Sequence, residues 1–127
     1  MSTFVKTKFN FETFAIYQEG LEFLKVIYII TKKFPKEELF GVTSQLRRAA
    51  VSIILNIAEG SSRTRKDFAH FLSLSKGSCF ECVAILEICK SQEYITDIEY
   101  NELYEKLNKL SRMISKFQAT LRTANNE

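Results

Sequence analysis

The sequence predicts an all-α protein, an antiparallel up-down-up-down four-helix bundle that assembles into a homo-oligomer. Four stretches place apolar residues at intervals of three and four, which is the spacing of one helix face. No stretch combines the alternating pattern and the turn residues of paired strands. The connections between the four stretches are short, so antiparallel neighbours are the economical arrangement.

Length and composition fit a single domain over residues 1–127. Hydrophobic residues make up 46% of the chain and charged residues 26%, which are ordinary values for a soluble globular protein. No apolar run reaches the roughly 20 residues that cross a bilayer, and the N-terminus lacks the apolar segment of a secretory signal. An odd number of cysteines, three, favours reduced thiols. We therefore expect a cytoplasmic protein that does not contact a membrane.

The first helix is expected over residues 11–33, and Phe34-Pro35 ends it because proline disfavours helical geometry in the residue before it. Gly20 lies inside this helix, where glycine costs about 1 kcal/mol relative to alanine. It is either a tolerated imperfection or the mark of a close approach by another helix. A heptad-like row is expected to face the core: Phe14, Tyr17, Leu21, Leu24, Tyr28 and Thr31, flanked by Ile16, Phe23, Ile27 and Ile30.

The second helix, expected over residues 44–59, organises the chain. Thr43 or Ser44 is its predicted N-cap, and Gly60 ends it. One face carries Leu46, Ala50, Ile53 and Ile57. Further apolar residues lie on its other sides, so a small bundle cannot cover the helix completely. Ile54 and Leu55 are therefore predicted at an oligomer interface or against a second helix layer.

The third and fourth helices are expected over residues 65–91 and 97–122. Thr64 with Asp67, and Thr96 with Glu99, have the spacing of capping arrangements. The buried row of the third helix is predicted to contain Phe68, Phe71 or Leu72, Ser75, Cys79, Cys82, Leu86 and Cys89. The fourth helix has the most regular heptad pattern in the chain: Leu103, Leu107, Leu110, Ile114, Phe117 and Leu121.

Asn56 and Glu59 are polar residues among Ile and Ala, where burial is costly unless each finds a partner. We expect Asn56 to cap or bridge backbone groups. Glu59 is expected to pair with a basic residue, with Arg47 or Arg48 as candidates. The alternative is that Glu59, near the end of its helix, faces solvent.

No pattern in the sequence indicates catalysis, a metal or a cofactor, so we expect a protein that is not an enzyme. His70 is the only histidine, whereas two-metal carboxylate bundles use Glu-x-x-His twice. Cys79 and Cys82 have C-x-x-C spacing but lie within an apolar helical row, where core filling is the favoured interpretation.

The basic residues are the most informative polar feature. Five of them bracket the second helix, and we predict that they bind RNA or DNA: Arg47, Arg48, Arg63, Arg65 and Lys66. Phosphate backbones are bound by accumulating such contacts. A net charge of only +3 keeps two alternatives open, an ordinary solvated face and an oligomeric scaffold that binds a protein and no nucleic acid.

The segment FPKEELFGVTSQLRRAAVSIILNIAEGSSR, residues 34–63, resembles the hallmark of the small four helix bundle protein family. Some members of that family are encoded by intervening sequences in bacterial 23S rRNA genes, and it is also called an S23 ribosomal protein family. The opening Phe11, Phe14, Tyr17 and Gln18 and the segment FLSLSKGSCFE, residues 71–81, extend the likeness over nearly the whole chain. In the shared motif Arg47 and Arg48 match paired basic residues, and Asn56, Glu59 and Gly60 match N-I-A-E-G.

This family is similar to the accessory variability determinant of diversity-generating retroelements. The resemblance implies a bacterial protein, a homopentamer with a basic surface, and nucleic acid and a reverse transcriptase as partners. The chain departs from the family at Ile54, because the family has a proline in the middle of this helix. We expect the second helix to be straighter as a result.

Overall fold

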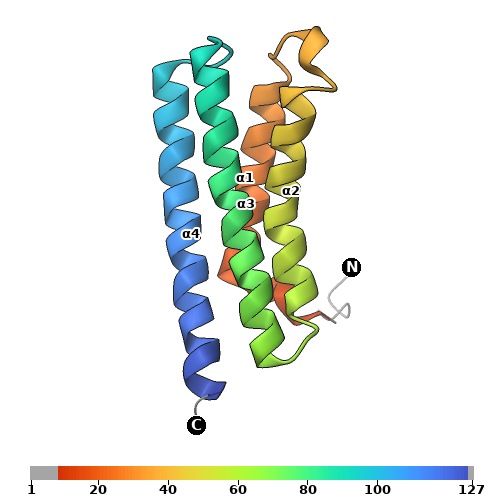
Figure 1. Ribbon diagram of the computed structural model, residues 1–127, viewed down its shortest axis with the longest axis vertical. Helices are drawn as coiled ribbons and strands as arrows, with labels where there is room; N and C mark the ends of the chain where they lie inside the picture. The colour runs from red at the N-terminus through yellow and green to blue at the C-terminus, as the bar shows by residue number, and fades with distance from the viewer. Residues whose placement is uncertain (1–8, 126–127) are drawn as a thin grey trace, which may run out of the picture.

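A computed structural model describes residues 9–125, with side chains as far as Thr123. Four helices, α1 (Ala15–Thr31), α2 (Val42–Gly60), α3 (Arg65–Ser91) and α4 (Asp97–Asn125), run alternately up and down the molecule (Figure 1). Short 3-10 helices, η1 (Asn10–Thr13) and η2 (Lys36–Glu38), precede α1 and α2. The predicted all-α four-helix bundle is confirmed, and no strand occurs in residues 9–125. The first eight and last two residues of the expected domain lie outside the described part.

Helix α1 differs from the prediction in its start and in the face that it buries. Phe14 is extended, with φ −73° and ψ 132°, so η1 and α1 are separate helices. The core face consists of four residues expected on the flank, Ile16, Phe23, Ile27 and Ile30, together with Gly20 and one residue of the predicted row, Thr31. Tyr28, expected in the buried row, is 40% exposed.

Gly20 explains this rotation of α1. A Cβ atom at Gly20 would collide with the Cγ2 methyl of Ile54 on α2. The two helices therefore come together at the one position of α1 that has no side chain, and the row containing Gly20 turns toward the core. Of the two interpretations offered for this glycine, the structure supports the close approach.

Helix α2 begins one residue before its predicted N-cap. Neither Thr43 nor Ser44 caps it, and Thr43 is buried within the first turn. The Oε1 atom of Glu38 instead accepts a hydrogen bond from the backbone N–H of Val42 at 3.2 Å. The preceding 3-10 helix brings this carboxylate to the helix N-terminus, where negative charge is stabilising.

The caps of the last two helices are as predicted. The Thr64 hydroxyl accepts from the N–H of Asp67 at 3.2 Å. Thr96 and Glu99 form a reciprocal capping box: the N–H of Glu99 donates to the Thr96 hydroxyl at 3.0 Å, and the N–H of Thr96 donates to the Glu99 carboxylate at 2.9 Å. Each pair satisfies backbone donors that a helix start leaves open.

The core confirms most of the predicted rows. Leu46, Ala50, Ile53 and Ile57 of α2 are fully buried. The rows of α3 and α4 are buried as well, with Phe71 and Phe117 partly covered. Within the described residues, no helix combines the length and apolar character that membrane crossing requires.

A buried glutamine joins α3 and α4. Gln118 is 1% exposed, and its Nε2 donates to the carbonyl of Ala69 and to the hydroxyl of Ser73, both at 2.7 Å. Its Oε1 accepts from the ammonium of Lys76 at 2.9 Å. Both polar atoms of the amide group are therefore satisfied inside the bundle, which is the condition for burying it at low cost.

Candidate nucleic-acid interface

The structure separates the five predicted nucleic-acid-binding residues into two groups. Arg47 and Arg48 lie in the first half of α2, whereas Arg63, Arg65 and Lys66 follow its end. At 1.5 Å per helical residue, Arg48 and Gly60 are about 18 Å apart along the axis. The five residues therefore do not form one patch on a single protomer.

The first group lies where α1, η2 and α2 meet, and Lys32 and Lys36 join it there. We call Lys32, Lys36, Arg47 and Arg48 the head cations. None of the four takes part in a salt bridge within residues 9–125. Lys32, Lys36 and Arg48 are exposed, and Arg47 is half-buried. Their charges are left for solvent or for a ligand.

Arg47 is held in place by α1. Its Nε donates to the Thr31 hydroxyl at 2.9 Å, and its guanidinium carbon lies 4.5 Å from the centroid of the Tyr28 ring. These contacts fix the guanidinium on the outer surface between α1 and α2. A pre-positioned arginine loses less side-chain entropy when it binds an anion than a freely rotating one would.

The second group consists of Arg63, on the connector after α2, and Arg65 and Lys66, in the first turn of α3. We call these three residues the connector cations. Arg63 donates to the Glu59 carboxylate at 2.7 Å and lies 5.1 Å from the centroid of the Phe71 ring. Arg65 and Lys66 are exposed. The Arg63–Glu59 side chains are 44% and 56% exposed, so solvent screening leaves this pair little effect on stability.

Glu59 therefore pairs with a basic residue, but the partner is Arg63 and not the proposed Arg47 or Arg48. Those two arginines lie about three helical turns away on the same helix. An i,i+4 neighbour across the helix end is within reach, so Glu59 needs no second subunit to find a cation.

The rest of the N-I-A-E-G motif serves the contact between α2 and α3. The Nδ2 of Asn56 donates to the carbonyl and hydroxyl of Ser52, at 2.9 and 3.1 Å. The Ser52 hydroxyl also accepts from the Ser78 hydroxyl of α3 at 2.8 Å. A Cβ atom at Gly60 would lie 2.7 Å from Cβ of Phe71, so only glycine lets α3 pass this close. The expected backbone bridge by Asn56 is present.

Of the two predicted interface residues, Ile54 is used inside the protomer. It is 6% exposed and contacts α1 at Gly20, so it belongs to the second helix layer that was the other expectation. Leu55 is 59% exposed on the outer face of α2. Leu55 alone remains available to another subunit.

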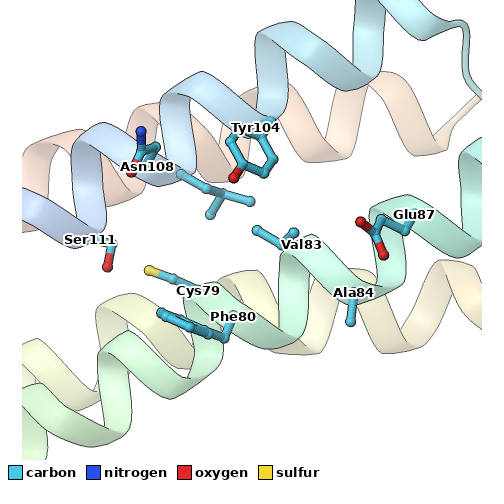
Figure 2. A pocket seen from close by; sticks show the side chains of 9 residues that line it. Cys79, Phe80, Val83, Ala84, Glu87, Tyr104, Asn108 and Ser111 are labelled. Carbon is cyan, nitrogen blue, oxygen red and sulfur yellow. The ribbon is translucent and has the colours of Figure 1, made fainter.

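A groove also lies between α3 and α4 (Figure 2). Its walls carry Phe80, Val83 and Tyr104, and the Glu87 carboxylate lies at one end. Tyr100 donates to this carboxylate at 3.3 Å. Because of its acidic group and apolar walls, this groove does not favour an anionic ligand.

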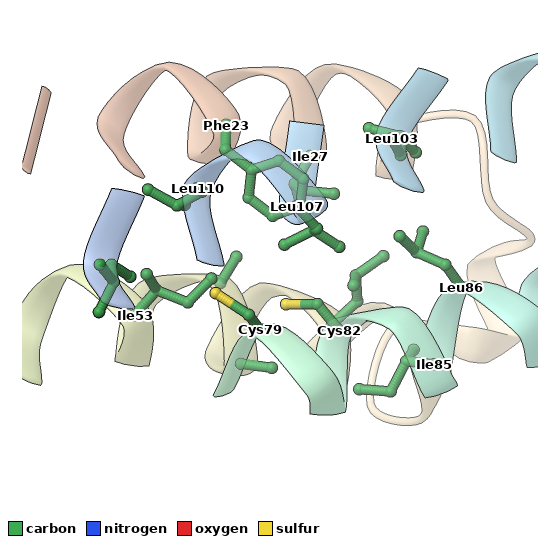
Figure 3. Close-up of a cluster of buried hydrophobic side chains, with 14 of the residues drawn as sticks. Phe23, Ile27, Ile53, Cys79, Cys82, Ile85, Leu86, Leu103, Leu107 and Leu110 are labelled. Atoms are coloured by element: carbon green, nitrogen blue, oxygen red, sulfur yellow. The ribbon is translucent and has the colours of Figure 1, made fainter. Parts of the chain in front are cut away.

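The three cysteines lie in the core, as predicted. Figure 3 shows two of them, Cys79 and Cys82, among the buried apolar side chains. All three are free thiols, and burial raises the pKa of Cys79 to about 12 and that of Cys89 to about 11, with the pKa of Cys82 raised further. His70 is exposed on α3. In the part of the chain that the structure describes, no three His, Cys, Asp or Glu side chains come together as metal ligands could.

Sequence analysis missed two residues that border the head cations, Tyr28 and Phe40. Tyr28 is predicted in the core row of the first helix, and the sequence pattern predicts no role for Phe40. Phe40 is 93% exposed between η2 and α2. The signal in the sequence that Phe40 is exposed is its place beside Gly41 in a connector, because it belongs to no apolar row of the helix before it or the helix after it.

One of the comparisons with known proteins shows the family. The model of the 23S rRNA-intervening sequence protein family matches residues 12–116. A crystal structure of a protein of unknown function from the S23 ribosomal protein family of Bacteroides thetaiotaomicron superposes with a TM-score of 0.75 and 24% sequence identity. The alignment covers 82% of this chain and 95% of that one, and at this identity it shows the shared fold. Comparison with curated proteins gives no significant match. With a family match that includes all of α1, α2 and α3, this chain belongs to the 23S rRNA-intervening sequence protein family.

Proposed function

We propose that this protein is a non-enzymatic, homo-oligomeric nucleic-acid-binding protein that acts as an accessory factor of the rRNA-intervening-sequence or retroelement type. The observation that carries the proposal is the set of head cations, four positive side chains without a salt-bridge partner in residues 9–125. Such a surface suits a phosphate backbone, because each contact releases counterions and adds to affinity. The connector cations extend the positive surface to the other end of α2.

The oligomer in this proposal forms through the outer face of α2. Leu55 is a large apolar side chain exposed in the middle of that helix, and Val51 lies one turn before it, half-buried. A ring of copies, a pentamer in the arrangement that the family resemblance implies, would repeat both groups of cations around its axis. Repetition turns a few contacts per subunit into many on one nucleic acid.

The test is nucleic-acid binding by the intact oligomer at several salt concentrations. The logarithm of the binding constant should fall with the logarithm of salt by about 0.9 per phosphate contact on duplex DNA and about 0.7 on single strands. Changing the three connector cations to alanine should flatten this slope and weaken binding to all sequences alike. A control variant with Lys25, Lys106 and Lys109 changed to alanine removes the same charge elsewhere and should affect the slope less.

A second function is favoured by a different observation, the apolar side chains exposed on α3. Leu74, Phe80 and Ile88 are 45%, 70% and 50% exposed, which suits a protein partner. An oligomeric scaffold that binds a protein, such as a reverse transcriptase, would use this face and need no nucleic acid. Failure of the intact oligomer to retain RNA or DNA on a filter at low salt would remove the first function and leave the scaffold.

A further inference from the structure

Two neighbouring hollows lie on the outer corner of the bundle formed by α1, η2 and α2. One is bordered by Tyr28, Phe40, Arg48 and Leu55, and the other by Lys32, Pro35 and Lys36. They meet at Leu39 and Arg47, which line both. We call this pair of hollows the corner groove.

The corner groove is lined by cations and by no carboxylate. All four head cations border it, and no described Asp or Glu does. The Glu38 carboxylate on η2 is engaged elsewhere: it accepts from the Val42 N–H and from the Tyr94 hydroxyl, at 3.2 and 2.9 Å. Glu37 is exposed on η2 but does not line the groove. The groove therefore has the charge that a polyanion requires.

Aromatic rings stand beside these cations. Phe40 is 93% exposed, and Tyr28 is 40% exposed with the Arg47 guanidinium over its ring. A single exposed apolar residue is ordinary on a protein surface, but an exposed ring among unpaired cations is the combination that single-strand-binding proteins use. The cations follow the sugar-phosphate backbone, and the ring stacks on a base.

We propose that the corner groove binds single-stranded nucleic acid, with a base stacked on Phe40 and the backbone held by the head cations. The proposal rests on the proposed function and narrows it from nucleic acid in general to unpaired strands. A duplex hides the faces of its bases, so Phe40 gives no advantage for duplex binding. Leu55 and Val51, which border one end of the groove, are left to the proposed subunit contact. A second copy of the chain is the less favoured occupant of the rest, because charged residues are depleted from the centres of subunit contacts and four cations lie there.

The absence of tryptophan from the chain permits a direct test of stacking. Phe40→Trp introduces one fluorophore at the corner groove, and Phe80→Trp introduces one at another exposed site, in the groove between α3 and α4. The probes are oligo(U) and oligo(dT) of about 16 nucleotides, the upper end of known site sizes for one single-strand-binding fold, and a duplex hairpin of the same charge. Stacking should quench the tryptophan at position 40 with the single strands and leave that at position 80 unchanged.

Affinity provides the second measurement. Phe40→Ala should weaken binding of the single strands by roughly five- to a hundredfold, and duplex binding should change little. Phe80→Ala is the matched control and should leave both affinities unchanged. Because Phe40 is almost fully exposed, neither substitution at this position removes core contacts, and circular dichroism should show the same helix content as the unmodified protein.

The outcomes separate the failure of this inference from the failure of the proposed function. Nucleic-acid binding without quenching at position 40 and without loss in Phe40→Ala would overturn the corner groove and leave nucleic-acid binding standing. No binding of any probe by the unmodified oligomer would overturn both. A Phe40→Ala variant that changes its mass in light scattering, with strand affinity intact, would assign Phe40 to a subunit contact and also overturn the inference.

Discussion

Gly20 and Gly77 allow the same substitution to be made in two helices with opposite expected effects. Helix propensity alone favours alanine over glycine by about 1 kcal/mol at either position. At Gly20 the added methyl would collide with Cγ2 of Ile54, a branch methyl that cannot swing aside, and overpacking of this kind costs about 1–3 kcal/mol. Gly20→Ala should therefore lower the free energy of unfolding by about 0–2 kcal/mol.

Gly77→Ala is the control, because a Cβ atom there would have nothing within 4 Å. It should raise the free energy of unfolding by about 1 kcal/mol. The gain in helix propensity is the same in both variants, so the difference between their free energies of unfolding is the steric cost at Gly20. We expect this cost to be about 1–3 kcal/mol, or roughly 4–12 °C in Tm for a chain of this size. Urea unfolding followed by circular dichroism measures both, at equal protein concentration because an oligomer's stability depends on it.

A double-mutant cycle tests the assigned cause. In an Ile54→Ala background the colliding methyl is absent, so Gly20→Ala should become stabilising, with a coupling energy of about 0.5–3 kcal/mol between the two positions. If Gly20→Ala stabilises the unmodified protein as much as Gly77→Ala does, α1 and α2 are not in close contact at Gly20. The explanation given for the rotation of α1 would then be wrong.

Three further predictions concern assembly, the thiols and acid stability. Leu55→Asp should dissociate the proposed oligomer without loss of helix, because it buries a charge in the subunit contact. Ile29→Asp, at an exposed position of α1, is the control and should leave the oligomer intact. Light scattering measures the mass of both variants, and a monomeric unmodified protein would contradict the prediction. The three buried thiols should resist alkylation below pH 9.0 until urea unfolds the chain. Because burial raises the pKa of Cys79 from 9.0 to about 12, the free energy of unfolding should fall as the pH rises between these two values. The hydrogen bond from Lys33 lowers the pKa of Glu99 below 4.5. The ionised carboxylate therefore stabilises the fold above pH 4.5, and its contribution is lost as the pH falls below that value. In Glu99→Gln the free energy of unfolding, measured at several pH values, should depend less on pH in this acidic range.

The sequence was sufficient to predict most of the fold, because the core rows of the last three helices can be read at helical spacing. Leu46, Ile53 and Ile57 of α2 are fully buried, as their row predicts, and the capping pairs fix the starts of α3 and α4. Helix α1 has two apolar rows of similar strength. The choice between them depends on where α2 makes its closest approach, which is a tertiary contact that periodicity does not encode.

The candidate site was only partly predictable. The identities of the five basic residues could be read from the chain, and helical rise alone implies that Arg48 and Arg63 are far apart. Their salt-bridge partners could not be read in the same way, because the predicted candidates for Glu59 were Arg47 and Arg48, whereas the partner is Arg63, one helical turn after it. Phe40 was missed because exposure depends on what packs over a connector, and the sequence does not show that nothing does.

The buried amide of Gln118 has a consequence for how α4 finds its place. The leucine and isoleucine row of this helix repeats every seven residues, so sliding α4 by one heptad, about 10 Å, would return apolar side chains to similar positions. The same slide in one direction would bring Ser111 opposite Ala69 and Ser73 in place of Gln118. The hydrogen bonds that the amide makes there would be lost, at a cost of about 1–3 kcal/mol for a buried group left unsatisfied. A seam of leucines alone would permit several alignments of nearly equal energy. One glutamine with partners on a single turn of α3 gives α4 a unique register.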